Sequence, residues 1–330
     1  MQFAMDKNDK MKTDYPIDLV YLWVDGSDPA WLQRKNQYLR WAGQKEHELA
    51  VPERWQDNNE LLFSLRSVEC FAPWINHIYL VTDQQCPEWL NTNHLQLTLV
   101  DHKDFIPEKY LPFFSSEAIE SFIPYIPGLS EHFLFANDDM FFGREISWKR
   151  FFDKNGNPLV MVKRLSENNF VSDRQQTEEL MKSSGLASRV RANLLVSEMF
   201  SMDLNWEAGH VIDPCRKSYM LEALAEPAFA SAFEKTRECR FRSPEAVQRI
   251  LFPLYDYCKG RCRLLDVAHF KEVKRILCPW KLPLFLSKVG DLRKVRKIRP
   301  EMFCYYTGDY YDELQNFFNE YYPEKSSFEK

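Results

Sequence analysis

The stretch Ile17-Asp18-Leu19-Val20-Tyr21-Leu22-Trp23-Val24 ends in Asp25-Gly26-Ser27-Asp28, and the stretch Phe133-Leu134-Phe135-Ala136 ends in Asn137-Asp138-Asp139. Each is an apolar run of the kind that forms a buried strand, and each stops at a cluster of acids. Ligands of α/β sheets bind beyond the carboxyl ends of the strands. The two stretches therefore predict an α/β sheet with an acidic ligand site at one edge.

The region from residue 17 to residue 142 alternates between strand and helix patterns. Further strands are expected at Ile78 to Thr82 and at Leu97 to Val100, each followed by an acid. Helices are expected at Asp57 to Phe71, where Asp57 and Glu60 have the spacing of a capping box, and at Ser115 to Ile123. Strands that alternate with helices indicate a mainly parallel sheet covered on both faces.

The pattern weakens after Gly143. Residues 155–158 have the composition of a turn, and the polar residues 166–185 are expected to form a mobile loop or an insertion. Helices are expected at Arg189 to Met202, Ser218 to Glu234, Pro244 to Cys258 and Asp309 to Tyr321. The expected organisation is a polar segment 1–16, a catalytic core 17–260, and a basic helical C-terminal region 261–330 that completes the domain.

Composition excludes several classes of protein. The 330 residues are 45% hydrophobic and 28% charged, as in ordinary globular domains. With 10 glycines and neither a GxGxxG motif nor a P-loop, no glycine-rich phosphate loop is expected. The polar start does not resemble a secretory signal, and no run of about 18 apolar residues predicts a membrane span. Scattered cysteines favour reduced thiols and the cytoplasm. Nucleic acid is not an expected partner.

The basic run from Arg293 to Arg299 stands out against a net charge of −5. Such a run can meet anionic lipid headgroups or a polyanionic substrate. It can equally be the solvated face of a helix.

Asp138 and Asp139 are the expected metal ligands. Two adjacent carboxylates at the end of a buried strand repel each other and need a cation or hydrogen bonds to stay ionised. Oxygen ligands suit Mg²⁺ or Mn²⁺, which take few protein carboxylates together with phosphate oxygens. A solvated turn is the alternative, and the flanking phenylalanines argue against it.

Three further segments carry candidate binding or catalytic groups. Trp23 to Pro29 forms a turn whose acids and amides can meet a base, a ribose or a phosphate, or is an ordinary polar turn. Arg54 to Glu60 begins a helix, which can hold an anion or simply be capped. His210 can accept a proton at neutral pH, and arginines that follow it, such as Arg242, suit phosphate. From spacing alone, the signal of His210 is weak.

Taken together, these segments resemble the four conserved regions of the Stealth family of sugar-1-phosphate transferases. The regions are similar to Ile17 to Pro29, Arg54 to Gly143, Gly209 to Glu245 and Phe317 to Glu329. The chain departs from the expected family pattern at Ser115 and at the segment Tyr305 to Asp309. The departure at Ser115 concerns a contact with the sugar donor. The departure at Tyr305 to Asp309 concerns the role of the C-terminal region.

The resemblance implies a glycosyltransferase-A-like core. It also implies transfer of hexose-1-phosphate, with GlcNAc as the expected hexose, from a UDP-sugar to an acceptor sugar hydroxyl of a capsular or surface polysaccharide. The reaction would release UMP. Asp138 and Asp139 would hold Mg²⁺ or Mn²⁺, His210 or Asp138 would be the general base, and Arg242 would stabilise phosphoryl charge. The expected substrate-binding residues are Trp23, Asp25, Gly26, Ser27, Asp28, Arg54, Asn58, Asn59, Glu60, Ser116 and Asn137.

Two alternatives remain open from the sequence. One is a metal-dependent glycosyltransferase that attacks the sugar carbon and releases UDP. The other is a non-catalytic carbohydrate-binding protein of a capsule assembly complex. For the enzyme, the resemblance implies the bacterial cytoplasm, with peripheral contact to the inner face of the membrane or to that complex.

Overall fold

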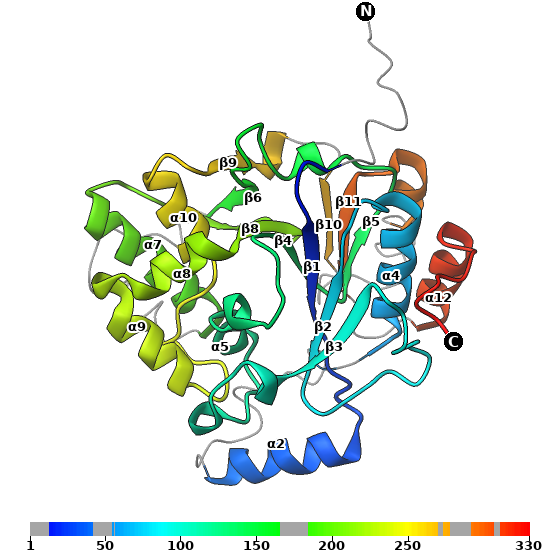
Figure 1. Ribbon diagram of the computed structural model, residues 1–330, viewed down its shortest axis with the longest axis horizontal. Coiled ribbons are helices and arrows are strands. Elements are labelled where there is room, and N and C mark those ends of the chain that lie inside the picture. The colour runs from blue at the N-terminus through cyan, green and yellow to red at the C-terminus, as the bar shows by residue number, and fades with distance from the viewer. Residues whose placement is uncertain are drawn as a thin grey trace, which may run out of the picture.

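The computed structural model describes residues 13–41, 55, 57–165, 184–269, 273–277, 292–306 and 311–330. A central sheet has the strand order β3-β2-β1-β4-β8 (Figure 1). Its strands are β1 (Ile17–Leu22), β2 (Ile78–Thr82), β3 (Leu97–Asp101), β4 (His132–Asn137) and β8 (Asp213–Arg216). All neighbours pair in parallel except β4 and β8, which are antiparallel. The expected α/β class with a mainly parallel sheet is confirmed.

Two smaller sheets and a set of helices complete the described chain. The smaller sheets have the orders β10-β11-β5 and β7-β6-β9. Their strands are β5 (Met140–Phe142), β6 (Leu159–Arg164), β7 (Trp206–Ala208), β9 (Arg263–Asp266), β10 (Val273–Leu277) and β11 (Met302–Tyr306). The helices are α2 (Pro29–Trp41), α4 (Glu60–Phe71), α5 (Ser116–Glu120), α7 (Ser184–Phe200), α8 (Lys217–Ala225), α9 (Pro227–Glu238), α10 (Leu251–Cys258) and α12 (Tyr311–Tyr321).

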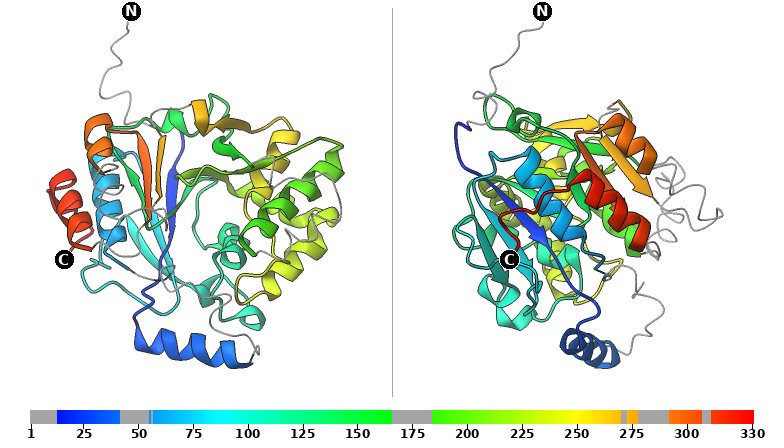
Figure 2. Two further views of the ribbon diagram at one scale, coloured as in Figure 1. Left: turned by 180° about the vertical axis from the view of Figure 1, so that it is seen from behind. Right: turned by 90° about the vertical axis from the view of Figure 1, so that its right-hand side faces the viewer.

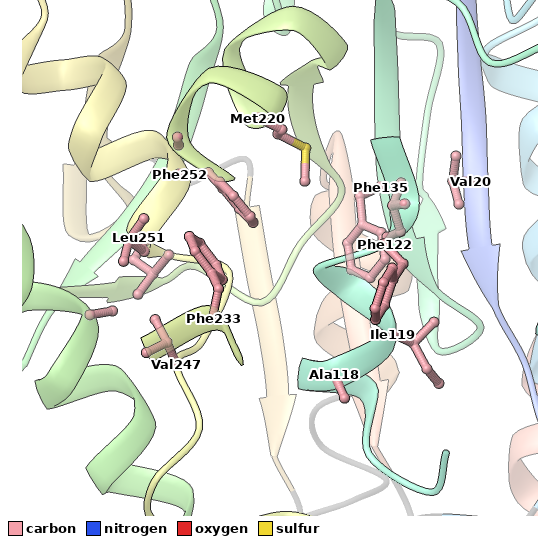
Figure 3. Packing of buried hydrophobic residues seen from close by; sticks show 14 of the residues in the cluster. Val20, Ala118, Ile119, Phe122, Phe135, Met220, Phe233, Val247, Leu251 and Phe252 are labelled. Carbon is pink, nitrogen blue, oxygen red and sulfur yellow. The ribbon is translucent and has the colours of Figure 1, made fainter. Parts of the chain in front are cut away.

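The central sheet is apolar on both faces, which explains why its strands show continuous apolar runs. Val20 and Phe135 belong to the core on one face, whereas Leu19 and Leu134 belong to the core on the other. In Figure 3, Phe135 of β4 points toward Phe122, which follows α5, while Met220 of α8 and Phe252 of α10 lie across from them. The sheet is therefore held between two hydrophobic cores.

The C-terminal helix α12 packs against α4 (Figure 2). The rings of Phe63 and Phe318 stack with centroids 5.0 Å apart. After α12 the chain returns to the loop beyond β2, where the backbone N–H of Lys330 donates to the carbonyl of Trp89 over 2.9 Å. The end of the chain thereby belongs to the same folded body as its first strands.

The expected strands and helices of residues 17–142 are present, with bounds that differ by a few residues. The expected helix from Ser218 to Glu234 is instead two helices, since Pro227 lacks an N–H and starts α9. The expected helix from Pro244 begins only at Leu251, because the amides of Val247 and Gln248 donate to Thr236 and Ser188 of other elements.

The region after residue 260 contains helices, as expected, and also the strands β9, β10 and β11. Residues 166–183 of the expected loop, residues 1–12 and residues 278–291 lie outside the described residues. Within the part of the chain that the structure describes, no helix is both long enough and apolar enough to cross a bilayer.

Candidate functional site

The two acidic stretches meet at one edge of the central sheet. β1 and β4 are parallel neighbours, and Leu22 at the end of β1 lies opposite Asn137 at the end of β4. The residues that follow both strands therefore emerge side by side at the carboxyl edge, where ligands of such sheets bind. Because of this register, the loop that contains Asp25 and the loop that contains Asp138 and Asp139 leave the sheet at the same edge.

The loop after β1 is a tightly bonded turn. Asp25 Oδ1 accepts from the amide and the hydroxyl of Ser27 over 2.8 and 2.6 Å. Gln85, after β2, exchanges hydrogen bonds of 3.0 and 2.8 Å with the backbone of Asp25. Gly26 is required because a Cβ there would lie 2.3 Å from the carbonyl oxygen of Trp55. The turn thus has a rigid structure of its own, whatever it binds.

Asp28 has a structural role at the same turn. Its Oδ1 accepts from the amide of Trp31 over 2.7 Å and caps the start of α2. Two other acids at strand ends are similarly used: Asp83 pairs with Arg34 at 3.0 Å, and Asp101 caps the turn that follows β3. These bonds satisfy the carboxylates without any ligand.

The start of α4 supplies two more acids. The expected N-cap at Asp57 is wrong: α4 begins at Glu60, with Asn59 at its N-cap in the left-handed conformation, φ 61°. Asp57 accepts instead from the amide of Asn59 over 2.9 Å. Glu60 accepts from the amide and the side chain of Asn58 over 2.6 and 2.8 Å. Because a left-handed residue interrupts the helical backbone, the capping box cannot form.

The acids at this edge are crowded. Burial raises the pKa of Glu60 to about 7 and that of Asp57 to about 6. Burial, and then the charges of Asp139, Glu60 and Asp57, raise the pKa of Asp138 well above its usual range. Asp139 is held by β11, since its carboxylate accepts from Cys304 Sγ over 3.3 Å and its carbonyl from the amide of Tyr305 over 3.0 Å. This concentration of negative charge favours a cation.

The donor set at the end of β4 fits a hard divalent ion. Among the described residues, no three His, Cys, Asp or Glu side chains converge into a complete metal site. Asp138 and Asp139 offer two carboxylates, and Mg²⁺ characteristically uses one or two carboxylates with water and substrate phosphate for the rest. A bound cation would also offset the repulsion that raises the pKa of Asp138.

His210 lies near the same edge. β8 runs antiparallel to β4 and pairs Asp213 with Phe135, so the residues just before Asp213 lie toward the carboxyl end of β4. His210 has a φ of 53°, a left-handed conformation that costs a non-glycine residue about 1 kcal/mol or more. Gly209 before it is packed against the backbone of Met161, where a Cβ would lie 2.9 Å from the carbonyl oxygen. Such strained residues concentrate at functional sites.

Ser116 and Arg242 lie together on the α5 side of the sheet. Arg242 Nη2 is 3.5 Å from Ser116 Oγ. Glu120, one helical turn after Ser116, lies near Arg249, and Arg249 pairs with Asp213 at the head of β8. Ser116 and Arg242 are therefore connected, through Glu120 and Arg249, to the strand that follows His210.

The remaining predicted residues have varied positions. Trp23 is buried, with 6% of its surface exposed, in the core on the α4 face. The Asn137 backbone amide donates to Met140 Sδ over 3.5 Å. Arg54 lies outside the described residues. Sequence reasoning missed Gln85 and Arg249, which no motif signals because their partners are distant in the chain.

Most of the chain is similar to known proteins. The model described as Stealth protein CR1, conserved region 1, matches residues 15–40, and that of CR2, conserved region 2, matches residues 54–160. An exopolysaccharide phosphotransferase of Streptomyces coelicolor is 35% identical over 96% of this chain and 53% of its own. The receptor polysaccharide phosphotransferase WefC of Streptococcus oralis is 35% identical over 74% of this chain and 79% of its own.

The chain thus spans about half the length of the Streptomyces relative. Among solved structures, the bifunctional glycosyltransferase WbbM has a TM-score of 0.44 and 12% identity, over 95% of this chain and 50% of that one.

Proposed function

The chain belongs to the Stealth family, and from this premise we propose that it transfers hexose-1-phosphate, with GlcNAc as the hexose, from a UDP-sugar to a hydroxyl of a surface polysaccharide. The product is a phosphodiester, and UMP is released. The main observation behind the proposal is the cluster of carboxylates around Asp138 at the carboxyl edge of the sheet. Such a site suits a metal-bound diphosphate.

The donor would bind across the ends of β1 and β4. Asp138 and Asp139 would hold Mg²⁺ or Mn²⁺, which when bound neutralises charge on the diphosphate. The turn from Asp25 to Asp28, with Trp23 before it, would line the nucleotide side, and the segment from Arg54 to Glu60 would lie beside the phosphates. In this arrangement the rigid bonding of Asp25 to Ser27 and Gln85 keeps the turn in place before the donor arrives.

Transfer would proceed by attack of the acceptor hydroxyl oxygen on the phosphorus that bears the sugar. A new P–O bond forms, the bond to the bridging oxygen breaks, and that oxygen leaves with UMP. His210 would accept the hydroxyl proton, with Asp138 as the rival base. Arg242, held near Ser116, would stabilise the charge that develops on the phosphoryl oxygens.

The acceptor and the location are part of the same proposal. A polysaccharide or oligosaccharide acceptor would approach the carboxyl edge in the cytoplasm, at the inner face of the membrane or in a capsule assembly complex. The exposed side chains of Arg293, Arg296, Lys297 and Arg299 would contact anionic lipid or the anionic polymer.

Identification of the released nucleotide tests the proposal. Purified protein is incubated with UDP-GlcNAc, Mg²⁺ and a capsule oligosaccharide, and the series is repeated with other UDP-hexoses. UMP together with a new phosphodiester signal by phosphorus NMR supports sugar-phosphate transfer. UDP would mean attack at the sugar carbon, as in a glycosyltransferase, and the proposed mechanism would be wrong. Release of neither nucleotide from any UDP-hexose would reject the donor class.

A further inference from the structure

Arg249 lies between two acids that belong to different elements. Its guanidinium donates to the Asp213 carboxylate, and its Nε lies 3.9 Å from Glu120 Oε2. The side chains of Arg249, Asp213 and Glu120 are 15%, 3% and 9% exposed. The guanidinium also lies over the ring of Phe135, 4.7 Å from its centroid. Charges buried to this degree need partners at fixed places, so the contacts hold three chain segments together.

The space beside these charges is too small for a substrate. Glu120, Asp213 and Arg249 line a cavity of about 30 Å³ together with apolar side chains that include Met220 and Phe252. A cavity of this size accommodates about two water molecules and no sugar ring. Arg249 therefore acts on neighbouring parts of the protein, and a direct contact with the donor or acceptor is not indicated.

Both acids lie on segments that carry a catalytic candidate. Asp213 follows His210 by three residues and is the first residue of β8. Glu120 lies one turn after Ser116 on α5, and Ser116 contacts Arg242. Arg249 thus joins the segment of His210 to the segment that contacts Arg242.

The backbone of His210 indicates why such an anchor is needed. Its φ of 53° is a left-handed conformation, which persists in a non-glycine residue only where the surrounding chain holds it. Gly209 fixes the chain on one side by its contact with Met161. On the other side, Val211 and Ile212 are 1% exposed, and Asp213 is bonded to Arg249.

We propose that Arg249 is a positioning residue for the transfer reaction, which holds the His210 segment through Asp213 and the Ser116–Arg242 pair through Glu120. The inference rests on the proposed function, because it assigns Arg249 to the placement of the base and of the phosphate-binding arginine. Arg249 would act through Asp213 and Glu120 and not by contact with substrate or metal.

Arg261 is a matched control. It also bridges two acids, Asp256 at 2.9 Å and Glu222 at 2.6 Å, and also lies over a ring, that of Tyr219, 4.0 Å from the centroid. It follows α10, whereas Arg249 precedes it. Arg261→Met therefore removes an arginine between two acids at the end of α10 away from Arg249, where one of the acids, Glu222, is 42% exposed.

The first measurement is NMR of the protein with labelled histidine, without substrate. The signal of His210 is assigned by its loss in His210→Ala. Arg249→Met is expected to move the His210 ring signals, Arg249→Lys to move them less, and Arg261→Met to leave them in place. Unchanged His210 signals in Arg249→Met would overturn the proposal. If Arg249→Met does not fold, Asp213→Asn is measured instead. Moved His210 signals would support the proposal, and unchanged signals would overturn it.

The second measurement is kinetic, on variants shown to be folded at the assay temperature. Arg249→Met is expected to lower kcat by about 10- to 100-fold, the effect of a displacement of about 1 Å, with little change in the KM of the UDP-sugar. Asp213→Asn combined with Arg249→Met is expected to lose no more than the single variants. A kcat equal to that of Arg261→Met would reject the positioning role. If the wild type releases no UMP, the proposed function fails, while the NMR result still decides whether Arg249 holds His210.

Discussion

At the scale of single residues, carboxylates with the same position in the sequence pattern have different roles. Asp83 follows β2 and Asp101 ends β3, yet both are satisfied by bonds within the protein. Asp138 also follows a strand, but burial, and then the charges of three neighbouring acids, raise its pKa. The distinction depends on what surrounds each carboxylate, and it separates structural acids from those that can hold a cation.

Asp138→Asn is expected to lower transfer activity by at least about 100-fold, because a neutral amide holds a divalent ion poorly. The same change is expected to raise the Tm at neutral pH, since it removes one of several charges that repel one another. Manganese binding, turnover and thermal unfolding measure the three effects. Asp101→Asn is the control: its amide oxygen can still cap the turn that follows β3, so stability and turnover are both expected to change little. Equal manganese affinity in wild type and Asp138→Asn would contradict the metal assignment.

His210 allows backbone strain to be separated from side-chain chemistry. His210→Gly and His210→Ala remove the same ring, but only glycine adopts φ 53° without a penalty. His210→Gly is therefore expected to be about 1 kcal/mol more stable than His210→Ala in urea unfolding.

Both His210 variants are expected to lose about 10²- to 10⁴-fold in kcat, the usual contribution of a general base. Near-normal turnover in either would leave Asp138 as the base. Equal stability of the two variants would mean that the left-handed backbone is not retained in solution.

At the scale of elements, the C-terminal region supports α4, whose first turn contributes acids to the site. Gln315 of α12 donates to the carbonyl of Asn58 over 2.6 Å. Tyr305 of β11 donates its amide to the carbonyl of Asp139 over 3.0 Å. The segment from Tyr305 to Asp309 departs from the expected family pattern, and residues 307–309 of it lie outside the described residues. Through these hydrogen bonds, α12 and β11 pack against the backbone of Asn58 and Asp139, next to the carboxylates of the candidate site.

A buried ion pair links α4 to the end of the chain. Arg66 Nε and Nη2 lie 2.8 and 2.7 Å from the carboxylate oxygens of Glu329, and the two side chains are 9% and 5% exposed. Glu329→Gln leaves the arginine charge buried without its counter-ion and is expected to cost about 3 kcal/mol of unfolding free energy.

Combining Glu329→Gln with Arg66→Met is expected to cost less than the sum of the single variants, as measured in urea. Strictly additive losses would show that the pair is not coupled. Arg150 pairs with Glu301 at 2.8 Å, and the two side chains are 17% and 22% exposed, so Arg150→Met provides a comparison at a less buried pair.

At the scale of the whole molecule, buried acids with raised pKa values make stability depend on pH. Burial raises the pKa of Asp256 to about 7, although Arg261 opposes the shift. A group whose pKa is higher in the folded than in the unfolded state stabilises the fold fully below its unfolded pKa, near 4, and this contribution is lost as the pH rises through 7. Glu120 contributes in the same direction, with a pKa of about 7.

The free energy of unfolding is therefore expected to fall between about pH 4 and pH 7, by a few kcal/mol at most for each such group. Asp256→Asn cannot titrate and is expected to flatten this part of the curve. Urea unfolding across the pH range measures the slope, and Glu324→Gln at an exposed acid serves as the control. A slope unchanged by Asp256→Asn would contradict the burial of an acid at this position.

The sequence by itself determined the α/β class and the strands β1 to β4, and it predicted a site at the carboxyl ends of these strands. Membership of the Stealth family, expected from the four similar regions, is confirmed by the comparisons. These features are local. An apolar run of five or six residues, or a motif such as Asn137-Asp138-Asp139, can be recognised in the sequence without information on the residues that it packs against.

Only the tertiary structure decided the rest. The strands β5 to β11 are three to six residues long and depend on partners far away in the chain, so that their periodicity alone does not reveal them. The left-handed Asn59 moved the start of α4 to Glu60, and the bonds of Arg249 to Asp213 and Glu120 join positions 36 and 129 residues apart. Such contacts depend on how the elements pack in three dimensions. The order of the residues along the chain does not show this packing directly.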